Sequence, residues 1–276
     1  MKKSNETLFV KAGTGVVSNA DRTQLDRESM RYIGTDITEI IGHQTDLILV
    51  SSGAVAAGKE KLGLESADYS DIRMQQIAAM TGNILLCQEW EKATGMVAAH
   101  DTPTQNDLKD KAHWDNLSGA IATSLKYGML PIFNEGDARS TEELQRIIHE
   151  DGGDFSRFGD NDQLAAHLAL NFHEFARRLT QQQTRVIFLT DVEGVREDPD
   201  RADSKIDTIQ HHEIEQIILG SVALERGSNG GMFSKLSAAK ILAEAGISVT
   251  VGAGKGEYAL LNLYNYEAGT HILPKS

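Results

Sequence analysis

The chain has 276 residues, of which 40% are hydrophobic and 24% charged, and its formal net charge is −13. This composition is typical of a soluble globular protein, and the acidic balance argues against a nucleic-acid partner, because phosphate backbones are bound by basic surfaces. No stretch approaches membrane-spanning length, the N-terminus M-K-K-S-N-E-T lacks a secretory signal, and the single cysteine, Cys87, cannot form an internal disulfide, so we expect a cytoplasmic protein without a membrane partner.

Hydrophobic periodicity predicts strands that alternate with helices. In chain order the predicted elements are a strand at residues 8–10, a helix at 25–42, a strand at 46–50, a helix at 72–90, a strand at 97–99, a helix at 114–127, a strand at 129–133, a helix at 164–179, a strand at 186–189, a helix at 233–245 and a strand at 247–251. This alternation is typical of an α/β fold with a mainly parallel sheet covered on both faces. We expect one domain over residues 1–276, with ligands at the carboxyl ends of the strands.

Two glycine-rich segments each place a lysine beside exposed backbone. Residues 227–235, G-S-N-G-G-M-F-S-K, have two adjacent glycines that let the backbone approach a ligand, followed by Lys235 at the start of a predicted helix. Lys11 precedes Gly13 directly after the first predicted strand. Backbone N–H groups with a nearby lysine bind phosphate oxygens, so the pair predicts a site that holds a phosphoryl group from both sides. Either lysine alone would also fit an exposed loop.

An acidic turn, F-G-D-N-D at residues 158–162, comes just before a predicted helix. Asp162 placed between the two lysines would hold their ammonium groups in position. The same residues would also serve as a helix N-cap with solvated acids, and this alternative stays open. The turns N-E-G-D at residues 134–137 and T-D at residues 190–191 follow other predicted strands and are further candidates.

The segment at residues 53–60, G-A-V-A-A-G-K-E, resembles a P-loop but ends in Glu60, which would repel phosphate and replaces the hydroxyl residue that binds Mg²⁺. The better interpretation is a glycine turn at a helix N-terminus. There Ser52 and the N–H groups of Gly53 and Ala54 could hold a carboxylate or a phosphate. No metal-ligand pattern and no dinucleotide-binding fingerprint is present in the sequence.

A separate segment at residues 140–157 precedes the acidic turn. Ser140 and Glu143 form a capping-box pattern, which predicts a short helix, and an acidic, glycine-containing loop follows at residues 149–157. We interpret this segment as a mobile flap over the site. A surface loop that has no role in ligand binding would explain the same residues equally well.

Taken together, six segments resemble the amino acid kinase family, and within it the branch that phosphorylates glutamate. In order they are V-K-A-G-T at residues 10–14, S-S-G-A-V-A-A-G at 51–58, N-E-G-D at 134–137, F-G-D-N-D at 158–162, L-T-D-V-E-G-V at 189–195 and G-G-M-F-S-K-L at 230–236. They span nearly the whole chain. The resemblance implies a three-layer α/β/α fold, the substrates ATP and L-glutamate, Mg²⁺, and a place as the first step of proline synthesis.

The resemblance also implies a role for each matched residue. Lys11 and Lys235 would stabilise the transferring phosphoryl group, and Asp162 would orient both lysines. The residues that would bind glutamate are Ser52, Gly53, Ala54, Asn134, Asp137 and Asn161. The residues that would face ATP, besides the two lysines, are Gly13, Thr14, Thr190, Asp191, Gly230, Gly231 and Met232.

Two positions and two lengths depart from the family pattern. Gly136 stands where the family usually has Asn, Gly15 where it usually has Ser, and the stretches 138–157 and 171–185 are longer than usual. Another acceptor therefore stays open, such as N-acetylglutamate, carbamate or UMP, as does a non-catalytic sensor of nucleotide or amino acid. Many members carry a C-terminal PUA domain, which we do not expect in this chain. We expect a homo-oligomer, a dimer or a tetramer.

Overall fold

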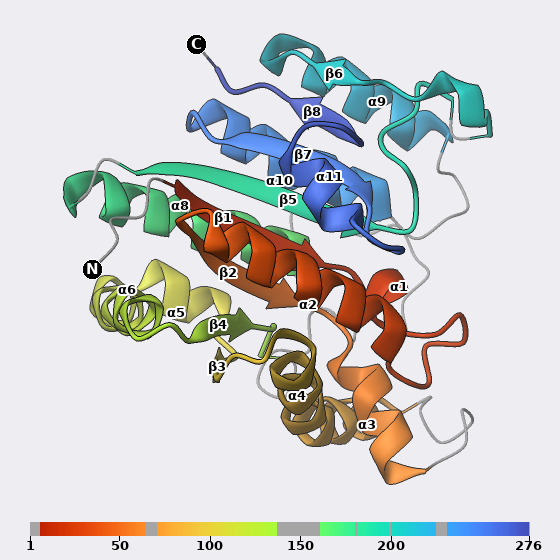
Figure 1. The fold of residues 1–276 in the computed structure, drawn as a ribbon. Coiled ribbons are helices and arrows are strands. Elements are labelled where there is room, and N and C mark those ends of the chain that lie inside the picture. Colours follow the sequence, from red (N-terminus) through yellow and green to blue (C-terminus); the bar gives the residue numbers. More distant parts are fainter. Residues whose placement is uncertain are drawn as a thin grey trace.

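The computed structural model describes residues 6–63, 71–136, 161–179, 182–198, 200–224 and 231–275, which form one sheet surrounded by helices (Figure 1). The strands are β1 (Glu6–Ala12), β2 (Thr45–Ser51), β3 (Ala98–Asp101), β4 (Leu130–Phe133), β5 (Gln183–Thr190), β6 (Thr208–Ile209), β7 (Ser248–Ala253) and β8 (Thr270–Ile272). The α-helices are α1 (Thr14–Val17), α2 (Arg27–Gly42), α3 (Ala54–Leu62), α4 (Ile72–Thr94), α5 (Gln105–Lys109), α6 (Lys111–Lys126), α8 (Asn161–Leu179), α9 (Ile214–Leu224), α10 (Gly231–Glu244) and α11 (Ala259–Tyr264). The short 3₁₀ helices are η2 (Ala202–Ser204) and η3 (His211–Glu213).

The sheet has the strand order β3-β4-β2-β1-β5-β7-β8-β6, with β1 and β5 at its centre. Neighbouring strands run parallel except β7 and β8, which are antiparallel. The register aligns Lys11 on β1 with Val50 on β2 and with Phe188 on β5, so the carboxyl ends of these strands lie side by side. The predicted, mainly parallel sheet is confirmed.

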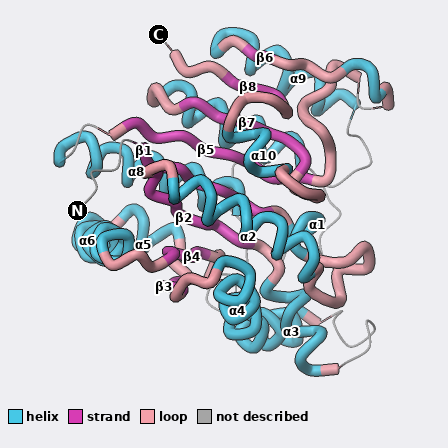
Figure 2. The backbone as a smooth tube through the Cα atoms, viewed as in Figure 1, coloured by secondary structure: helices cyan, strands magenta, loops and turns pink. Residues whose placement is uncertain are grey.

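Alternate residues of the central strands face opposite sides of the sheet, and each side has its own layer of helices. On β1, Phe9 belongs to one hydrophobic core, while Leu8 and Val10 belong to the other. The core around Phe9 is covered by α5, α6, α8, α9 and α10, and the core around Leu8 by α1, α2, α3, α4 and α11. Figure 2 shows the strands between these helices, so the three-layer α/β/α arrangement is confirmed.

Side-chain caps explain why two helices begin away from their predicted starts. α2 begins two residues later than predicted, because Asp26 caps it by accepting a hydrogen bond from the Ser29 N–H at 3.1 Å. α6 begins three residues earlier than predicted, because Asp110 accepts a hydrogen bond from the His113 N–H at 2.9 Å. The periodicity of apolar residues located both helices, and the capping carboxylates set their first turns.

Several short elements were not predicted, namely α1, α5, α11, β6 and β8. α1 has four residues and β8 has three, which is too short for hydrophobic periodicity to distinguish from a loop. β8 pairs antiparallel with β7 and is the exception within the mainly parallel sheet. The sheet is therefore wider than the predicted strands alone would make it.

Helices α3 and α4 approach each other at two glycines. A Cβ atom placed on Gly82 would lie 1.8 Å from the carbonyl oxygen of Ala54, and one placed on Gly58 would lie 1.9 Å from that of Ala78. Both distances are far shorter than van der Waals contact, so only glycine permits the approach. The contact fixes the start of α3, which follows the carboxyl end of β2, against the middle of α4.

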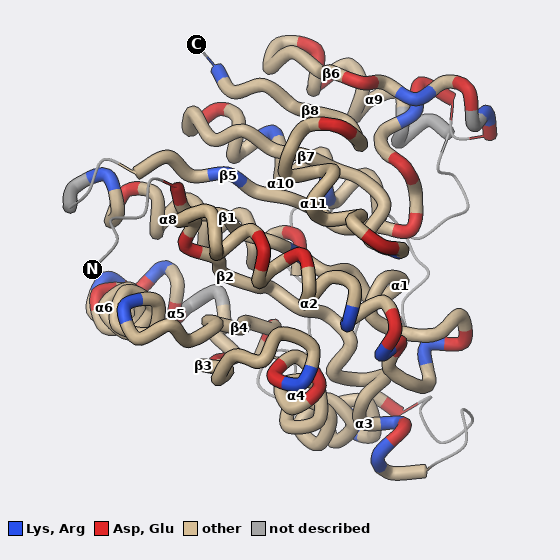
Figure 3. The backbone as a smooth tube through the Cα atoms, in the orientation of Figure 1, with Lys and Arg blue, Asp and Glu red and all other residues tan. Residues whose placement is uncertain are grey.

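Charged residues lie mostly on the helices and loops around the sheet (Figure 3). Among the described residues, no helix is both long enough and apolar enough to span a bilayer.

Candidate active site

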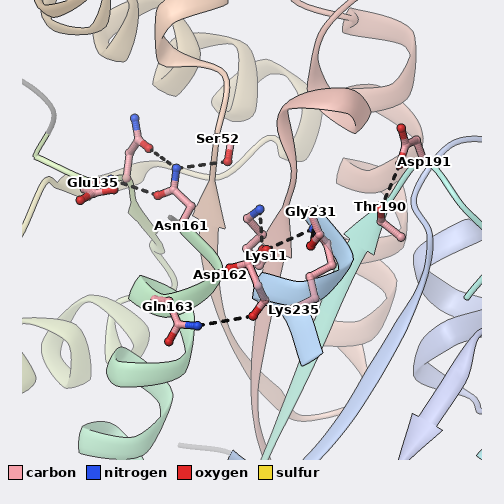
Figure 4. Close-up of polar contacts among 12 residues, drawn as sticks. Lys11, Ser52, Glu135, Asn161, Asp162, Gln163, Thr190, Asp191, Gly231 and Lys235 are labelled. Atoms are coloured by element: carbon pink, nitrogen blue, oxygen red, sulfur yellow. Dashed lines mark hydrogen bonds and ion pairs between the residues drawn. The ribbon is translucent and has the colours of Figure 1, made fainter. Parts of the chain in front are cut away.

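Two lysines and one carboxylate meet at the carboxyl edge of the sheet. Lys11, near the end of β1, has its Nζ 2.6 Å from Oδ1 of Asp162, which lies in the first turn of α8. Lys235 on α10 has its Nζ 3.1 Å from Oδ2 of the same carboxylate and also donates to the carbonyl oxygen of Gly231 at 3.2 Å. Figure 4 shows both ammonium groups converging on Asp162. The structure thus brings together the three residues to which the sequence assigned catalysis.

The charges of this cluster are almost fully removed from solvent. The side chains of Lys11, Lys235 and Asp162 are 5%, 8% and 1% exposed. Burial alone would raise the pKa of the Asp162 carboxyl, but the charges and hydrogen bonds of the two lysines outweigh burial and hold its pKa below the ordinary value. The three groups together carry one surplus positive charge. A buried surplus of this kind favours an anionic ligand.

A network of amides lies beside the lysines, where β2 and β4 end. Asn161, the residue before Asp162, donates from Nδ2 to Oγ of Ser52 at 3.1 Å and to Oδ1 of Asn134 at 3.0 Å. Its Oδ1 accepts a hydrogen bond from the Glu135 N–H at 3.1 Å. Asn134 in turn donates to Oδ1 of Asn83 on α4 at 3.0 Å. These contacts use both N–H groups of the Asn161 amide, so its geometry fits a residue that orients Ser52 and Asn134.

The turn between β2 and α3 lies beside the amide network, because Oγ of Ser52 accepts a hydrogen bond from Asn161. Gly53 has φ +106°, and a Cβ atom there would lie 2.7 Å from Cγ2 of Val17, so glycine is required on both counts. Two hydrogen bonds hold the start of this turn in place. Trp90 donates to Oγ of Ser51 at 2.9 Å, and the Ser52 N–H donates to the Ala12 carbonyl at 2.9 Å.

Residues expected to face ATP lie on the other side of the lysines, where β1 and β5 end. Thr14 begins α1 directly after Gly13, whose N–H donates to the Leu189 carbonyl at 3.4 Å. Thr190 donates to the Asp191 carboxylate at 3.1 Å. A Cβ atom on Gly15 would lie 3.4 Å from Oδ2 of Asp191, so the two segments are neighbours.

The strand order therefore places the predicted residues in a row. From β4 through β2 and β1 to β5, the row runs from the amide network through the ion cluster to the pair Thr190 and Asp191, and Figure 4 shows the same order. Gly231 and Met232 lie in the first turn of α10, one turn before Lys235. Such a row fits two ligands bound side by side with their reacting groups over the lysines.

Some predicted residues lie outside the described ranges, namely Asp137, Gly230 and the segment proposed as a flap. Gly136 is the last described residue before that gap. A Cβ atom there would lie 3.0 Å from the Thr102 carbonyl oxygen and 3.2 Å from Cγ2 of Thr104, so the 102–104 loop occupies the room that a larger side chain would need.

Two buried or half-buried residues of the site were missed by the sequence analysis. Asn83 was passed over because a single amide in a long apolar helix gives no local signal. Glu135 is 7% exposed and follows Asn134 in the N-E-G-D turn, a position that could have drawn attention to it. Among the described residues, no group of three or more His, Cys, Asp or Glu side chains could hold a metal ion.

Comparison with known sequences agrees with the matched motifs. Residues 6–253 match the amino acid kinase family. A glutamate 5-kinase from Citrifermentans bemidjiense is 30% identical over an alignment 286 positions long, gaps included, which covers 99% of this chain and 69% of the relative. A glutamate 5-kinase from Sphingopyxis alaskensis is 32% identical over 257 residues, which cover 90% of this chain and 63% of the relative. The chain therefore spans about two thirds of the length of these relatives.

Comparison with solved structures supports the same fold. The carbamate kinase from Giardia lamblia bound to AMP-PNP superposes with a TM-score of 0.67 at 16% identity, over 99% of each chain. At that identity the likeness speaks for the fold alone. With its strand topology, its buried lysine–aspartate–lysine cluster and a family match over most of its length, the chain belongs to the amino acid kinase family.

Proposed function

We propose that this protein is a glutamate 5-kinase, which transfers the γ-phosphoryl group of ATP to the γ-carboxylate of L-glutamate. The observation that carries the proposal is the buried cluster of Lys11, Asp162 and Lys235, whose surplus positive charge lies at the carboxyl edge of the sheet. Curated relatives at about 30% identity with this name support the choice of acceptor. The product, an acyl phosphate, suits the first step of proline synthesis in the cytoplasm.

The reaction needs positioning and charge neutralisation more than proton transfer. A carboxylate oxygen of glutamate attacks the γ-phosphorus, the bond to the β,γ-bridging oxygen breaks, and ADP leaves. Because the γ-carboxylate is already ionised at neutral pH, no general base is required. In the proposal the two ammonium groups stabilise the negative charge on the transferring phosphoryl oxygens, and Asp162 keeps both lysines aimed at that point.

In the proposal the two substrates bind on opposite sides of the cluster of Lys11, Asp162 and Lys235. Glutamate would lie over β2 and β4, with its reacting carboxylate on Ser52, Gly53 and Ala54 and the rest near Asn134, Asn161 and Asp137. ATP would lie over β1 and β5, near the residues Gly13, Thr14, Thr190, Asp191, Gly230, Gly231 and Met232. Mg²⁺ would arrive with ATP and neutralise charge on its phosphates. The binding of Mg²⁺ through ATP rather than through the protein is supported by Asp162. This carboxylate is paired with both lysines, so it is not offered to the metal ion.

An acceptor other than glutamate is the second candidate, because Gly136 departs from the family pattern and the 102–104 loop fills the space beside it. A panel of L-glutamate, L-aspartate, N-acetyl-L-glutamate, carbamate and UMP, each with Mg²⁺ and ATP, tests the choice. ADP release measures every acceptor, and hydroxylamine traps acyl phosphates as hydroxamates. We expect glutamate to give the highest kcat/KM. A higher value for another acceptor would overturn the assignment of substrate, and nucleotide binding without turnover of any acceptor would indicate a sensor.

We further infer the domain organisation and the oligomeric state. Residues 1–276 form one amino acid kinase domain, which is supported by the single sheet that the described ranges share. The enzyme is a homo-oligomer, a dimer or a tetramer, and light scattering coupled to gel filtration measures which.

A further inference from the structure

A chain of hydrogen bonds joins Trp90 to the turn between β2 and α3. The indole N–H of Trp90 donates to Oγ of Ser51 at 2.9 Å, and the Ser51 hydroxyl donates to the carbonyl oxygen of Ser52 at 3.0 Å. Trp90 lies on α4 and Ser51 is the last residue of β2, and both are completely buried. The sequence analysis assigned neither residue to the site.

The donors and acceptors of this chain leave it only one direction. An indole N–H can only donate, so Oγ of Ser51 accepts from Trp90. The hydroxyl has one proton, and its other partner, the Ser52 carbonyl oxygen, can only accept. The proton therefore lies between Ser51 and Ser52, and every group in the chain donates toward the turn.

The peptide between Ser52 and Gly53 continues the chain. This peptide is trans, so its carbonyl oxygen and its N–H point in opposite directions within one plane. Because the Ser51 hydroxyl holds the carbonyl oxygen, it also fixes the direction of the Gly53 N–H. The preceding peptide is held as well, since the Ser52 N–H donates to the Ala12 carbonyl at 2.9 Å.

We propose that Trp90 and Ser51 are positioning residues for the acceptor. They are the first two donors of a head-to-tail chain that ends at the Gly53 N–H and the γ-carboxylate of glutamate. This inference rests on the proposed function, which binds the carboxylate at that N–H. Hydrogen bonds in such a chain polarise one another, so an anion at the Gly53 N–H makes the Ser52 carbonyl oxygen a stronger acceptor and strengthens both bonds behind it. Trp90 is completely buried, so it acts on the acceptor only through Ser51.

A purely structural bond would satisfy the buried indole N–H and do nothing more. Here the Ser51 hydroxyl passes the bond on to a backbone carbonyl, and that carbonyl directly precedes Gly53, whose φ of +106° starts α3. α4 also carries Asn83, whose Oδ1 accepts from Asn134 in the amide network. One helix therefore supports the proposed acceptor side of the site at two separate places.

Calorimetry with L-glutamate compares the wild-type chain with Trp90→Phe, Ser51→Ala and the double variant. Ser51→Ala breaks the chain next to the carbonyl, so we expect the dissociation constant for glutamate to rise about tenfold, the loss of one hydrogen bond that supports a charged ligand. Trp90→Phe leaves the hydroxyl in place, and we expect a rise of about threefold. The double variant should match Ser51→Ala, because Trp90 acts only through Ser51. The dissociation constant for ATP should stay at the wild-type value throughout.

Two control variants separate positioning from general effects on the fold. Trp114→Phe makes the same change at the second tryptophan, which packs against the core on the opposite face of the sheet. Ile37→Val removes a methyl group from a completely buried residue of α2 and lowers stability without touching the chain of hydrogen bonds. Urea unfolding measures the stability of every variant, and both controls should bind glutamate like the wild type.

The indole N–H of Trp90 is also a spectroscopic probe, because the chain has only two tryptophans. The Trp114→Phe spectrum assigns the two indole signals in a proton–nitrogen correlation experiment. We expect saturating glutamate to move the Trp90 indole proton downfield, as a stronger hydrogen bond to Ser51 does, while the Trp114 signal stays in place. In Ser51→Ala the response of the Trp90 signal to glutamate should disappear.

Several results would overturn the inference. These are a Ser51→Ala protein that binds glutamate like the wild type, a double variant much weaker than Ser51→Ala, an Ile37→Val protein as impaired as Ser51→Ala, and a Trp90 indole signal that ignores bound glutamate. A wild-type chain that phosphorylates another acceptor would count against the proposed function alone. The same titrations with that acceptor would then decide whether Trp90 and Ser51 position it.

Discussion

Lys11 and Lys235, at opposite ends of the chain, share the two oxygens of one buried carboxylate, that of Asp162. Their separation in sequence means that the cluster exists only when β1, α8 and α10 are assembled. Each lysine has the same partner but a different supporting element, so their contributions can be separated by mutation.

We expect Lys11→Met and Lys235→Met each to lower kcat by about 10²–10³-fold, the loss that follows removal of one group stabilising charge in a transition state. Methionine keeps most of the side-chain volume, so the fold should remain intact. Lys92→Met is the control, because Lys92 is 69% exposed on α4 and should leave kcat unchanged. Steady-state kinetics measure all three, and near-normal turnover of either buried variant would contradict the roles proposed for the lysines.

Asp162→Asn should lower kcat more than it raises either KM, because it removes the group that aligns the lysines rather than a substrate contact. It should also change how stability depends on pH. Since the folded-state pKa of Asp162 is lowered, its carboxylate stabilises the fold above its unfolded pKa of about 3.9, and this contribution is lost as the pH falls through the lower folded-state value. Urea unfolding should therefore show a difference between wild type and variant at pH 7 that shrinks below about pH 4. A constant difference would contradict this account.

The amide network predicts graded effects on glutamate binding. Asn161→Ala removes three hydrogen bonds, and we expect it to raise the KM for glutamate about tenfold or more, with little change in the KM for ATP. Asn83→Ala removes one bond to Asn134, so its effect should be smaller, about fivefold. Asn171→Ala, on the same helix as Asn161 but bonded to the Leu108 carbonyl, is the control. A larger rise in the KM for glutamate for Asn83→Ala than for Asn161→Ala would contradict the central place of Asn161 in the network.

Asp137 is proposed to bind glutamate, and as a carboxylate it is the natural partner of the glutamate ammonium group, which Asp137→Ala tests. Loss of one member of a buried ion pair costs about 2–5 kcal/mol, so the KM for glutamate should rise at least about tenfold while the KM for ATP stays the same. Asp137→Asn is a useful second variant, because it keeps the volume and loses only the charge. An unchanged KM for glutamate would place the ammonium group elsewhere, and a change in the KM for ATP alone would reverse the placement of the two substrates.

Gly82→Ala should lower the free energy of unfolding by about 1–3 kcal/mol, because the added methyl group collides with the Ala54 carbonyl. Gly119→Ala is the matched control. Gly119 lies within α6 with no atom near the position of a Cβ, so alanine there should stabilise by about 0.5–1 kcal/mol through the helix propensity. Chemical unfolding measures both changes, and two variants of equal stability would show that α3 and α4 can separate at little cost.

The sequence predicted the elements whose signal is local. Long amphipathic helices and buried strands were located to within a few residues, and Lys11, Asp162 and Lys235 were found because each stands beside glycines or in a polar turn. Asn83 could not be found in this way, because its role depends on α4 lying against the end of β4. The antiparallel strand β8 was missed for a related reason, since three residues carry no periodicity and their pairing is decided by β7.

The close approach of α3 and α4 has a thermodynamic consequence for ligand binding. At Gly58 and Gly82 the backbones of α3 and α4 are in direct contact, so the helix that follows the turn of Ser52 and Gly53 packs closely on the helix that carries Asn83. We therefore expect this side of the proposed glutamate site to be preorganised, so that a bound carboxylate would lose its own freedom but impose little additional ordering on the protein. Binding there should accordingly carry a small conformational entropy cost, and the affinity for the acceptor would depend on its contacts rather than on closure of this wall.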